Sequence, residues 1–317
     1  MLLERGTNMR RRILLGGIIV GIVILGIVLA LPDSEDIIQQ NTQLIEESEM
    51  KEPESEVEMP EAEKPNSEEP ESEEEETETE ASDADNSKEE ELSLYHFLEN
   101  ALKPVGNTMY IWGGGWNEED TGAGVGATYI GLYPKWKDFM NKQDADYDYK
   151  QHRYELENGL DCSGFVGWTI YNTFEKENGK EGYVTNAKKM AVYFANKGWG
   201  HLIENPKQFL PGDIVSMASH VWICLGTCAD GSVLLVHASP PGVSVCGTKG
   251  IAEDLAKEYM SSLHADWQNK YPKREVPHSY IENVTLFRWT KGTMADAEEL
   301  QSLTGEEMIR RYWDTMD

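Results

Sequence analysis

The chain has 317 residues, 57 of them acidic and 28 basic, so its formal net charge is −29. This balance argues against nucleic acid as a partner, because phosphate binding needs clustered lysine and arginine side chains. The charge is uneven: +3 up to residue 32, −23 over residues 33–91 and −9 from residue 92 onward. The part after residue 91 is long enough to bury one sizeable hydrophobic core.

A basic segment and then an uncharged segment open the chain. Residues 1–12 carry four arginines, and the nineteen residues 13–31 carry no charge. A helix of that length spans roughly 28 Å, close to the thickness of a bilayer core. The positive-inside rule then predicts a single-pass anchor with residues 1–12 in the cytoplasm and the rest outside the cell. A cleaved signal peptide, with Val28-Leu29-Ala30 as its cleavage site, is the alternative interpretation.

Residues 32–92 are rich in Glu, Ser and Pro and contain almost no aromatic side chains. A stretch such as PESEEEETETEASDAD cannot bury enough apolar surface to offset the entropy of the chain. It predicts a disordered acidic linker. A neutral coil of about sixty residues would average roughly 45 Å end to end, and charge repulsion extends it further.

The composition of residues 93–292 is that of a folded domain, and residues 293–317 are expected to form a helical tail. Helical spacing predicts a helix in LYHFLENALKP, and glycines end a short strand in TMYIWGGG. Residues 116–158 are irregular. Two more helices are predicted, over residues 162–174 and from Thr185 to Asn196.

The pattern changes to strands after LPGD, in the segments IVSM, HVWICLG, SVLLVHA, GVSV and NVTLFRW. A helical segment over residues 250–268 interrupts them. In the tail, Thr304 and Glu307 have the spacing of a capping box that starts a last helix. Helices followed by mainly antiparallel strands predict an α+β fold.

One cysteine stands where the helix over residues 162–174 is predicted to begin, in the stretch ENGLDCSGFVGWTIYN. A helix N-terminus stabilises the thiolate, and its free N–H groups can hold an oxyanion. Gly164 lets another chain approach closely. A nucleophilic cysteine also needs a base, and His220 and His237 lie on predicted strands. The ordinary interpretation of such residues is a small buried cysteine and structural histidines.

Four blocks in this order, YIWGGG, LDCSGFV, LPGDIVSM…SHVWICLG and LLVHAS, resemble the NlpC family of bacterial cell-wall cysteine peptidases. The resemblance covers residues 94–289. It implies a papain-like α+β fold, in which N-terminal helices with the nucleophile at a helix N-terminus pack on an antiparallel sheet. It also implies an extracellular enzyme that cuts peptidoglycan stem peptides, most often between D-Glu and the dibasic third residue.

The resemblance assigns the catalytic roles residue by residue. Cys162 matches the nucleophile, His220 the general base and His237 the orienting third residue. The thiolate would attack a stem-peptide carbonyl, and water would hydrolyse the resulting acyl-enzyme.

Three further positions match substrate-binding residues of the family. Tyr110 matches a tyrosine that lies beside the nucleophile and helps to bind the oxyanion. Asp161 and Ser163 match residues that, in some members, hold the free amine of the substrate's L-Ala. No cofactor is implied, and a monomer is expected.

The sequence departs from the family pattern in three places. The insert over residues 116–158 is rich in aromatics, which either wall the cleft or, the interpretation we favour, pack against the core. Strand alternation places Trp222 on the same face as His220, where it would narrow the groove. The segment over residues 247–280 is longer than the family's loop.

Other constellations are weaker. The spacing of His220, Cys224 and Cys228 is not that of a zinc site, because a continuous strand turns these side chains apart, and we expect no metal. A disulfide between Cys228 and Cys246 is possible outside the cell, and free thiols are the alternative. An amidase or acyl/peptidyl transferase on the same fold, and an inactive wall-binding module, remain the other candidate functions.

Overall fold

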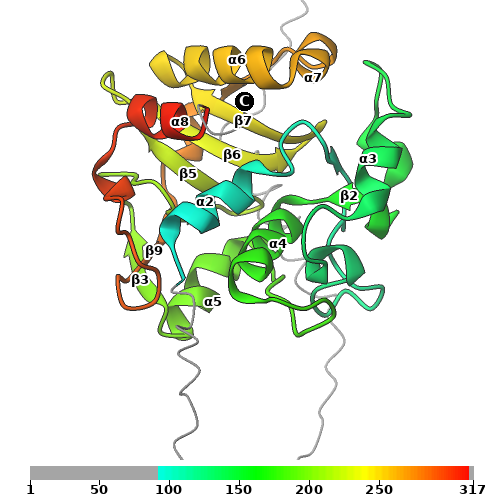
Figure 1. Ribbon diagram of the computed structural model, residues 1–317, viewed down its shortest axis with the longest axis horizontal. Coiled ribbons are helices and arrows are strands. Elements are labelled where there is room, and N and C mark those ends of the chain that lie inside the picture. Colours follow the sequence, from blue (N-terminus) through cyan, green and yellow to red (C-terminus); the bar gives the residue numbers. More distant parts are fainter. Residues whose placement is uncertain (1–91, 314–317) are drawn as a thin grey trace, which may run out of the picture. The chain divides into compact units, whose positions relative to one another are not determined.

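The computed structural model describes residues 92–313 (Figure 1). Its helices are α2 (Leu94–Leu102), α3 (Pro134–Met140), α4 (Cys162–Phe174), α5 (Met190–Asn196), α6 (Ile251–Leu263), α7 (Ala265–Lys270) and α8 (Gly305–Trp313). Its strands are β1 (Met109–Tyr110), β2 (Gly159–Leu160), β3 (Gly200–Glu204), β4 (Ile214–Ser216), β5 (Val221–Thr227), β6 (Val233–Ser239), β7 (Gly242–Thr248), β8 (Glu275–Val276) and β9 (Thr285–Trp289).

The strands form one mixed sheet that curves into a half-barrel, in the order β2-β1-β7-β6-β5-β4-β9-β3, with β8 paired to β7. The prediction of a papain-like fold on an antiparallel sheet is wrong, because β1 pairs parallel with β2 and β7 pairs parallel with β8. In both cases a long connection separates the two strands: the insert for β2, and α6 with α7 for β8. Such crossovers return the chain in its original direction, which makes parallel pairing possible.

The predicted anchor over residues 13–31 and the predicted linker lie outside the described residues, so the structure gives the preceding transmembrane helix no support. Within residues 92–313, no helix has both the length and the apolar character needed to cross a bilayer.

Helices cover the sheet on the side that forms the larger core. In Figure 1, α2 (cyan) and α4 (green) lie in front of the sheet, and α6 lies along its β7 side. Helix α4 contacts β5 and β6, α6 contacts β7, and α8 contacts β5. Most of α4 is buried, including Phe165 and Trp168, so its first turn is held in place by the core around it.

A second, smaller core contains Trp222, which is fully buried and stacks on Phe209 with ring centroids 5.9 Å apart. The expectation that Trp222 narrows a groove beside His220 is therefore wrong. Alternation does place Trp222 on the histidine face, because Trp222 shares this core with Leu235, two residues before His237 in β6, but that core covers its ring completely.

The sequence predicts the start of one helix correctly and the start of another a few residues too early. The Thr304 capping box is confirmed: its N–H donates to Glu307 Oε2 at 2.9 Å, and the Glu307 N–H donates to Thr304 Oγ1 at 3.3 Å. The helix expected from Thr185 begins later, at Met190, because a 3-10 turn over Ala187–Lys189 precedes it.

A buried ion pair joins two neighbouring strands. Arg288 of β9 donates from Nε and Nη2 to the two oxygens of Asp213, at 2.7 and 2.6 Å, just before β4. The Asp213 side chain is 0% exposed, and Oδ2 also accepts from the Leu210 N–H at 2.8 Å. The pair therefore fixes the LPGD turn to the sheet.

We predict that Arg288→Met lowers the free energy of unfolding by about 3–5 kcal/mol, because it leaves the Asp213 charge buried without a partner. Urea unfolding measures the loss. Adding Asp213→Asn should restore part of it, since the buried charge is then gone. A loss below about 1 kcal/mol would mean that the pair behaves as an exposed one.

Candidate active site

The start of α4 is built by its N-cap residue. Asp161 Oδ1 accepts from the Gly164 N–H at 2.7 Å and from Ser163 Oγ at 2.8 Å, which satisfies one of the free donors of the first turn. A side chain at Gly164 would overlap the carbonyl oxygen of Gly114, so the predicted close approach of another chain is confirmed. Cys162 is thereby fixed as the first residue of the helix.

The environment of the Cys162 thiol opposes ionisation. The residue is 8% exposed, and burial raises the pKa of the thiol to about 12, with a further increase from the negative charge of Asp161. Backbone N–H groups at the helix start and at Val221 lower this pKa, but by less. The prediction that the helix end stabilises a thiolate is therefore outweighed by burial, and the resting group is a neutral thiol.

The two predicted histidines meet. His220 precedes β5 and His237 lies in the neighbouring strand β6, and His220 Nε2 is 3.0 Å from His237 Nδ1. Burial lowers the pKa of His220 to about 4. The pKa of His237 falls well below its usual value through burial, then through the charges of His220 and Arg274. Both rings are therefore neutral at pH 7.

The histidine pair lies next to the cysteine. The sign of this is the Val221 N–H, which lowers the pKa of Cys162 and belongs to the residue that follows His220. Among residues 92–313, no hydrogen bond joins the thiol to the His220 ring. Catalytic hydrogen bonds are often long before substrate binds. His220 Nδ1 can accept the thiol proton only if Nε2 carries the ring proton and donates it to His237 Nδ1.

Tyr110 of β1 lies near the start of α4. Burial raises the pKa of its hydroxyl, and the charges of Cys162 and Asp161 raise it further, so the ring stands close to both. The insert holds it: the Tyr147 hydroxyl donates to the Tyr110 carbonyl at 2.6 Å, and the Tyr149 ring meets the Tyr110 ring edge-on at 5.4 Å.

Ser163 and Asp161 are both engaged in the unliganded structure. Trp116, the first residue of the insert, donates from Nε1 to Ser163 Oγ at 3.0 Å. Burial raises the pKa of Asp161 to about 6, although its hydrogen bonds with Gly164 and Ser163 oppose that change. The aromatics of the insert thus pack against the core, as Trp136 does on Trp168 at 5.7 Å, and also buttress the site.

Tyr280 is a site residue that the sequence did not reveal. It ends the 3-10 turn η5 (His278–Tyr280), and its ring centroid lies 5.3 Å from that of His220 and 5.8 Å from that of His237. Burial raises the pKa of its hydroxyl to about 12, followed by the charges of Cys246 and Cys162. The only sequence signal was the extra length of the segment over residues 247–280.

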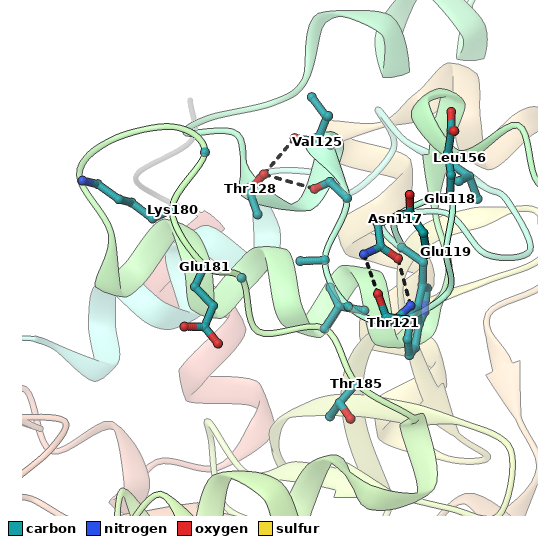
Figure 2. A pocket seen from close by; sticks show the side chains of 18 of the residues that line it. Asn117, Glu118, Glu119, Thr121, Val125, Thr128, Leu156, Lys180, Glu181 and Thr185 are labelled. Atoms are coloured by element: carbon teal, nitrogen blue, oxygen red, sulfur yellow. Dashed lines mark hydrogen bonds between the residues drawn. The ribbon is translucent and has the colours of Figure 1, made fainter. Parts of the chain in front are cut away.

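A large cavity lies apart from these residues. It has a volume of about 740 Å³ and is lined mainly by the insert and by residues 179–185 (Figure 2). Lys180 and Glu181 lie on one side of it and Glu118 and Glu119 on the other, and its lining includes neither Cys162 nor the histidine pair. A smaller cavity of about 360 Å³ is lined by His237 and Tyr280, so it is the one that adjoins the site.

The remaining cysteines do not form a bridge. Cys224, Cys228 and Cys246 are buried free thiols, so the suggested disulfide between Cys228 and Cys246 is wrong. Within residues 92–313, no group of three His, Cys, Asp or Glu side chains is arranged to hold a metal ion.

Comparisons with family models, with curated proteins and with solved structures give no match to this chain.

We predict that iodoacetamide alkylates Cys162 more slowly at pH 7–9 than it alkylates a free thiol, because a raised pKa leaves less thiolate. The rate should keep rising with pH towards the pKa of about 12. Mass spectrometry of the full chain measures the rate, and Cys162→Ala corrects for the other cysteines. A plateau with an apparent pKa below about 6 would show a stabilised thiolate instead.

We predict that Tyr280→Ala raises the pKa of His220 from about 4 towards its usual 6.5, because the ring that helps to bury it is gone. Tyr280→Phe keeps the ring and should leave that pKa unchanged. An NMR titration of the histidine rings reads both. Equal titration of the two variants would show that Tyr280 does not shield the pair.

Proposed function

We propose that the chain is an NlpC-type cysteine peptidase that hydrolyses peptidoglycan stem peptides outside the cell. One observation carries the proposal: the nucleophile candidate begins a helix beside a pair of histidines whose ring nitrogens are 3.0 Å apart. The proposed nucleophile begins α4, the proposed base precedes β5 and the proposed orienter lies in β6, which is the set of roles that such a mechanism requires.

The buried geometry favours a general-base mechanism. The neutral thiol transfers its proton to His220 Nδ1 as the sulfur attacks the substrate carbonyl. Free N–H groups at the start of α4 and the Tyr110 hydroxyl are placed to stabilise the oxyanion. The C–N bond then breaks, the leaving amine takes the proton from His220, and water hydrolyses the thioester. His237 holds the His220 ring in the tautomer that this sequence of steps needs.

The substrate class follows from the motif resemblance. The bond between D-Glu and the dibasic third residue is the proposed target, and the basic and apolar N-terminal sequence supports a location outside the cell. The protein is proposed to act as a monomer and to need no cofactor.

A transferase is the second candidate, and the burial of the thiol favours it. Cys162 is 8% exposed, and Tyr280 packs against both histidines. A site that excludes water protects an acyl-enzyme from hydrolysis and leaves it for an amine acceptor. Hydrolysis and transfer share the same thioester, so the products distinguish them.

The full-length protein, incubated with purified muropeptides, should release a fragment that begins at the dibasic residue, detected by mass spectrometry. New peptide linkages would identify a transferase, and bound but unchanged muropeptide would identify an inactive binding module. Cys162→Ala should abolish turnover. Activity that survives this substitution would refute the proposal.

We predict unequal losses for the two histidines. His220→Ala should lower kcat by about 10²–10⁴-fold, because the general base is lost. His237→Ala should cost less, because water can replace an orienting group. The rate of muropeptide cleavage at constant folded fraction measures both. Equal losses, or a larger loss for His237→Ala, would contradict the assigned roles.

A further inference from the structure

Polar and charged side chains line the smaller cavity beside His237. It has a volume of about 360 Å³ and is bounded by the β6–β7 turn, by β7 and by residues 270–277. Polar groups converge on it from several elements: Ser239, Ser244 and Arg274 line it together with His237 and Tyr280. Polar groups that meet in a cavity next to a reaction centre are typical of a substrate pocket.

Arg274 is the group that identifies what this pocket takes. The residue is 1% exposed, and only its Nη2 has a partner, the Tyr271 carbonyl at 2.5 Å. Its Nε and Nη1 are buried and have no hydrogen-bond partner among the described residues. No carboxylate of residues 92–313 forms an ion pair with it. A buried guanidinium with two unused donors is costly for a fold, so a ligand that meets them would be bound strongly.

We propose that this pocket is a carboxylate-binding subsite, in which Arg274 holds the carboxylate of a peptide positioned for attack by Cys162. The inference rests on the proposed function and extends it to substrate recognition. A guanidinium presents parallel N–H donors that match the two oxygens of a carboxylate. The two serines of the wall are already engaged, Ser239 with the Tyr280 hydroxyl and Ser244 with Cys246 Sγ at 3.5 Å, so Arg274 is the group left to meet the carboxylate.

Nε and Nη1 are covered in the unliganded structure, so the guanidinium has to turn towards the cavity to meet a ligand. Among the described residues its one hydrogen bond is to the Tyr271 carbonyl, so the turn exchanges one neutral hydrogen bond for two charge-assisted ones. The local charge favours an anion as well. Lys270, Lys273 and Glu275 also line the cavity, so with Arg274 its wall carries three basic side chains and one acidic one.

The position of the pocket indicates which carboxylate it holds. Pro241 forms part of one wall, and its carbonyl accepts a hydrogen bond from the Tyr110 N–H at 2.8 Å. Tyr110 in turn lies close to Cys162. The opposite group, Tyr280, packs on His220 and His237. The pocket is therefore on the histidine side of the sulfur, where the leaving amine receives its proton. We assign it to the α-carboxylate of the dibasic residue that leaves.

The test uses full-length Cys162→Ala protein, so that binding is measured without turnover. Calorimetry compares the tripeptide L-Ala-γ-D-Glu-L-Lys with its lysinamide form and with its D-isoglutamine form, which each lack one α-carboxylate. We expect the lysinamide peptide to bind about tenfold more weakly or worse, which is one lost charge-assisted contact. If instead only the isoglutamine peptide binds more weakly, the subsite stands and holds the α-carboxylate of D-Glu.

Arg274→Met should remove the difference between the peptides, while the matched control Lys249→Met, which deletes an exposed charge outside the pocket, should keep it. The melting temperature of Arg274→Met should stay within about 3 °C, because no ion pair is lost. Discrimination that persists in Arg274→Met would overturn the proposal.

A second measurement leaves Arg274 intact. Glutarate, a simple dicarboxylate, should shift the NMR resonance of Arg274 Nε–H on titration. A shift with glutarate but no binding of any tripeptide would leave the subsite standing and remove the proposed function. Equal binding of all three tripeptides, without a glutarate shift, would remove the subsite and leave the function standing.

Discussion

The 3.0 Å contact between His220 Nε2 and His237 Nδ1 is the interaction on which the proposed chemistry depends. Two neutral imidazoles can share one hydrogen bond only when one donates and the other accepts. The pairing of β5 with β6 brings the two rings together, and the register of β6 on β7 sets His237 opposite Ser244. A change in either register would therefore separate the proposed base from its partner as well as disturb the sheet.

Burial of the cysteine and the histidines bears on how the proposed reaction would move its proton. The same enclosure that raises the pKa of the Cys162 thiol to about 12 lowers the pKa of His220 to about 4. An ion pair of thiolate and imidazolium is disfavoured from both sides, so proton transfer has to accompany attack. Asp161 contributes to this balance, because the carboxylate that caps α4 also opposes negative charge on the neighbouring sulfur.

Features set by nearby residues could be predicted from the sequence. The helix start at Cys162, the close approach at Gly164, the capping box at Thr304 and the positions of most helices and strands follow from local spacing and side-chain chemistry. The two histidines could be chosen because they stand at the edges of apolar strands.

Features set by distant residues could not be predicted. The strands β2 and β8 are two residues each and carry no period, so their parallel pairing depends on where long connections return. Tyr280 and Arg274 lie in an irregular segment whose approach to the site is a property of the folded chain. The sequence predicted a stabilised thiolate at Cys162, whereas burial raises the pKa of its thiol. A helix end is visible in a sequence, and the depth of burial is not.

The most direct test of the central claim is the protonation state of the two rings, read from ¹⁵N chemical shifts of the histidines at pH 7 and assigned with the single His→Ala variants. The account predicts that both rings are neutral and that His220 carries its proton on Nε2, with Nδ1 free to accept the thiol proton. An imidazolium at His220, or a neutral ring with its proton on Nδ1, would contradict it.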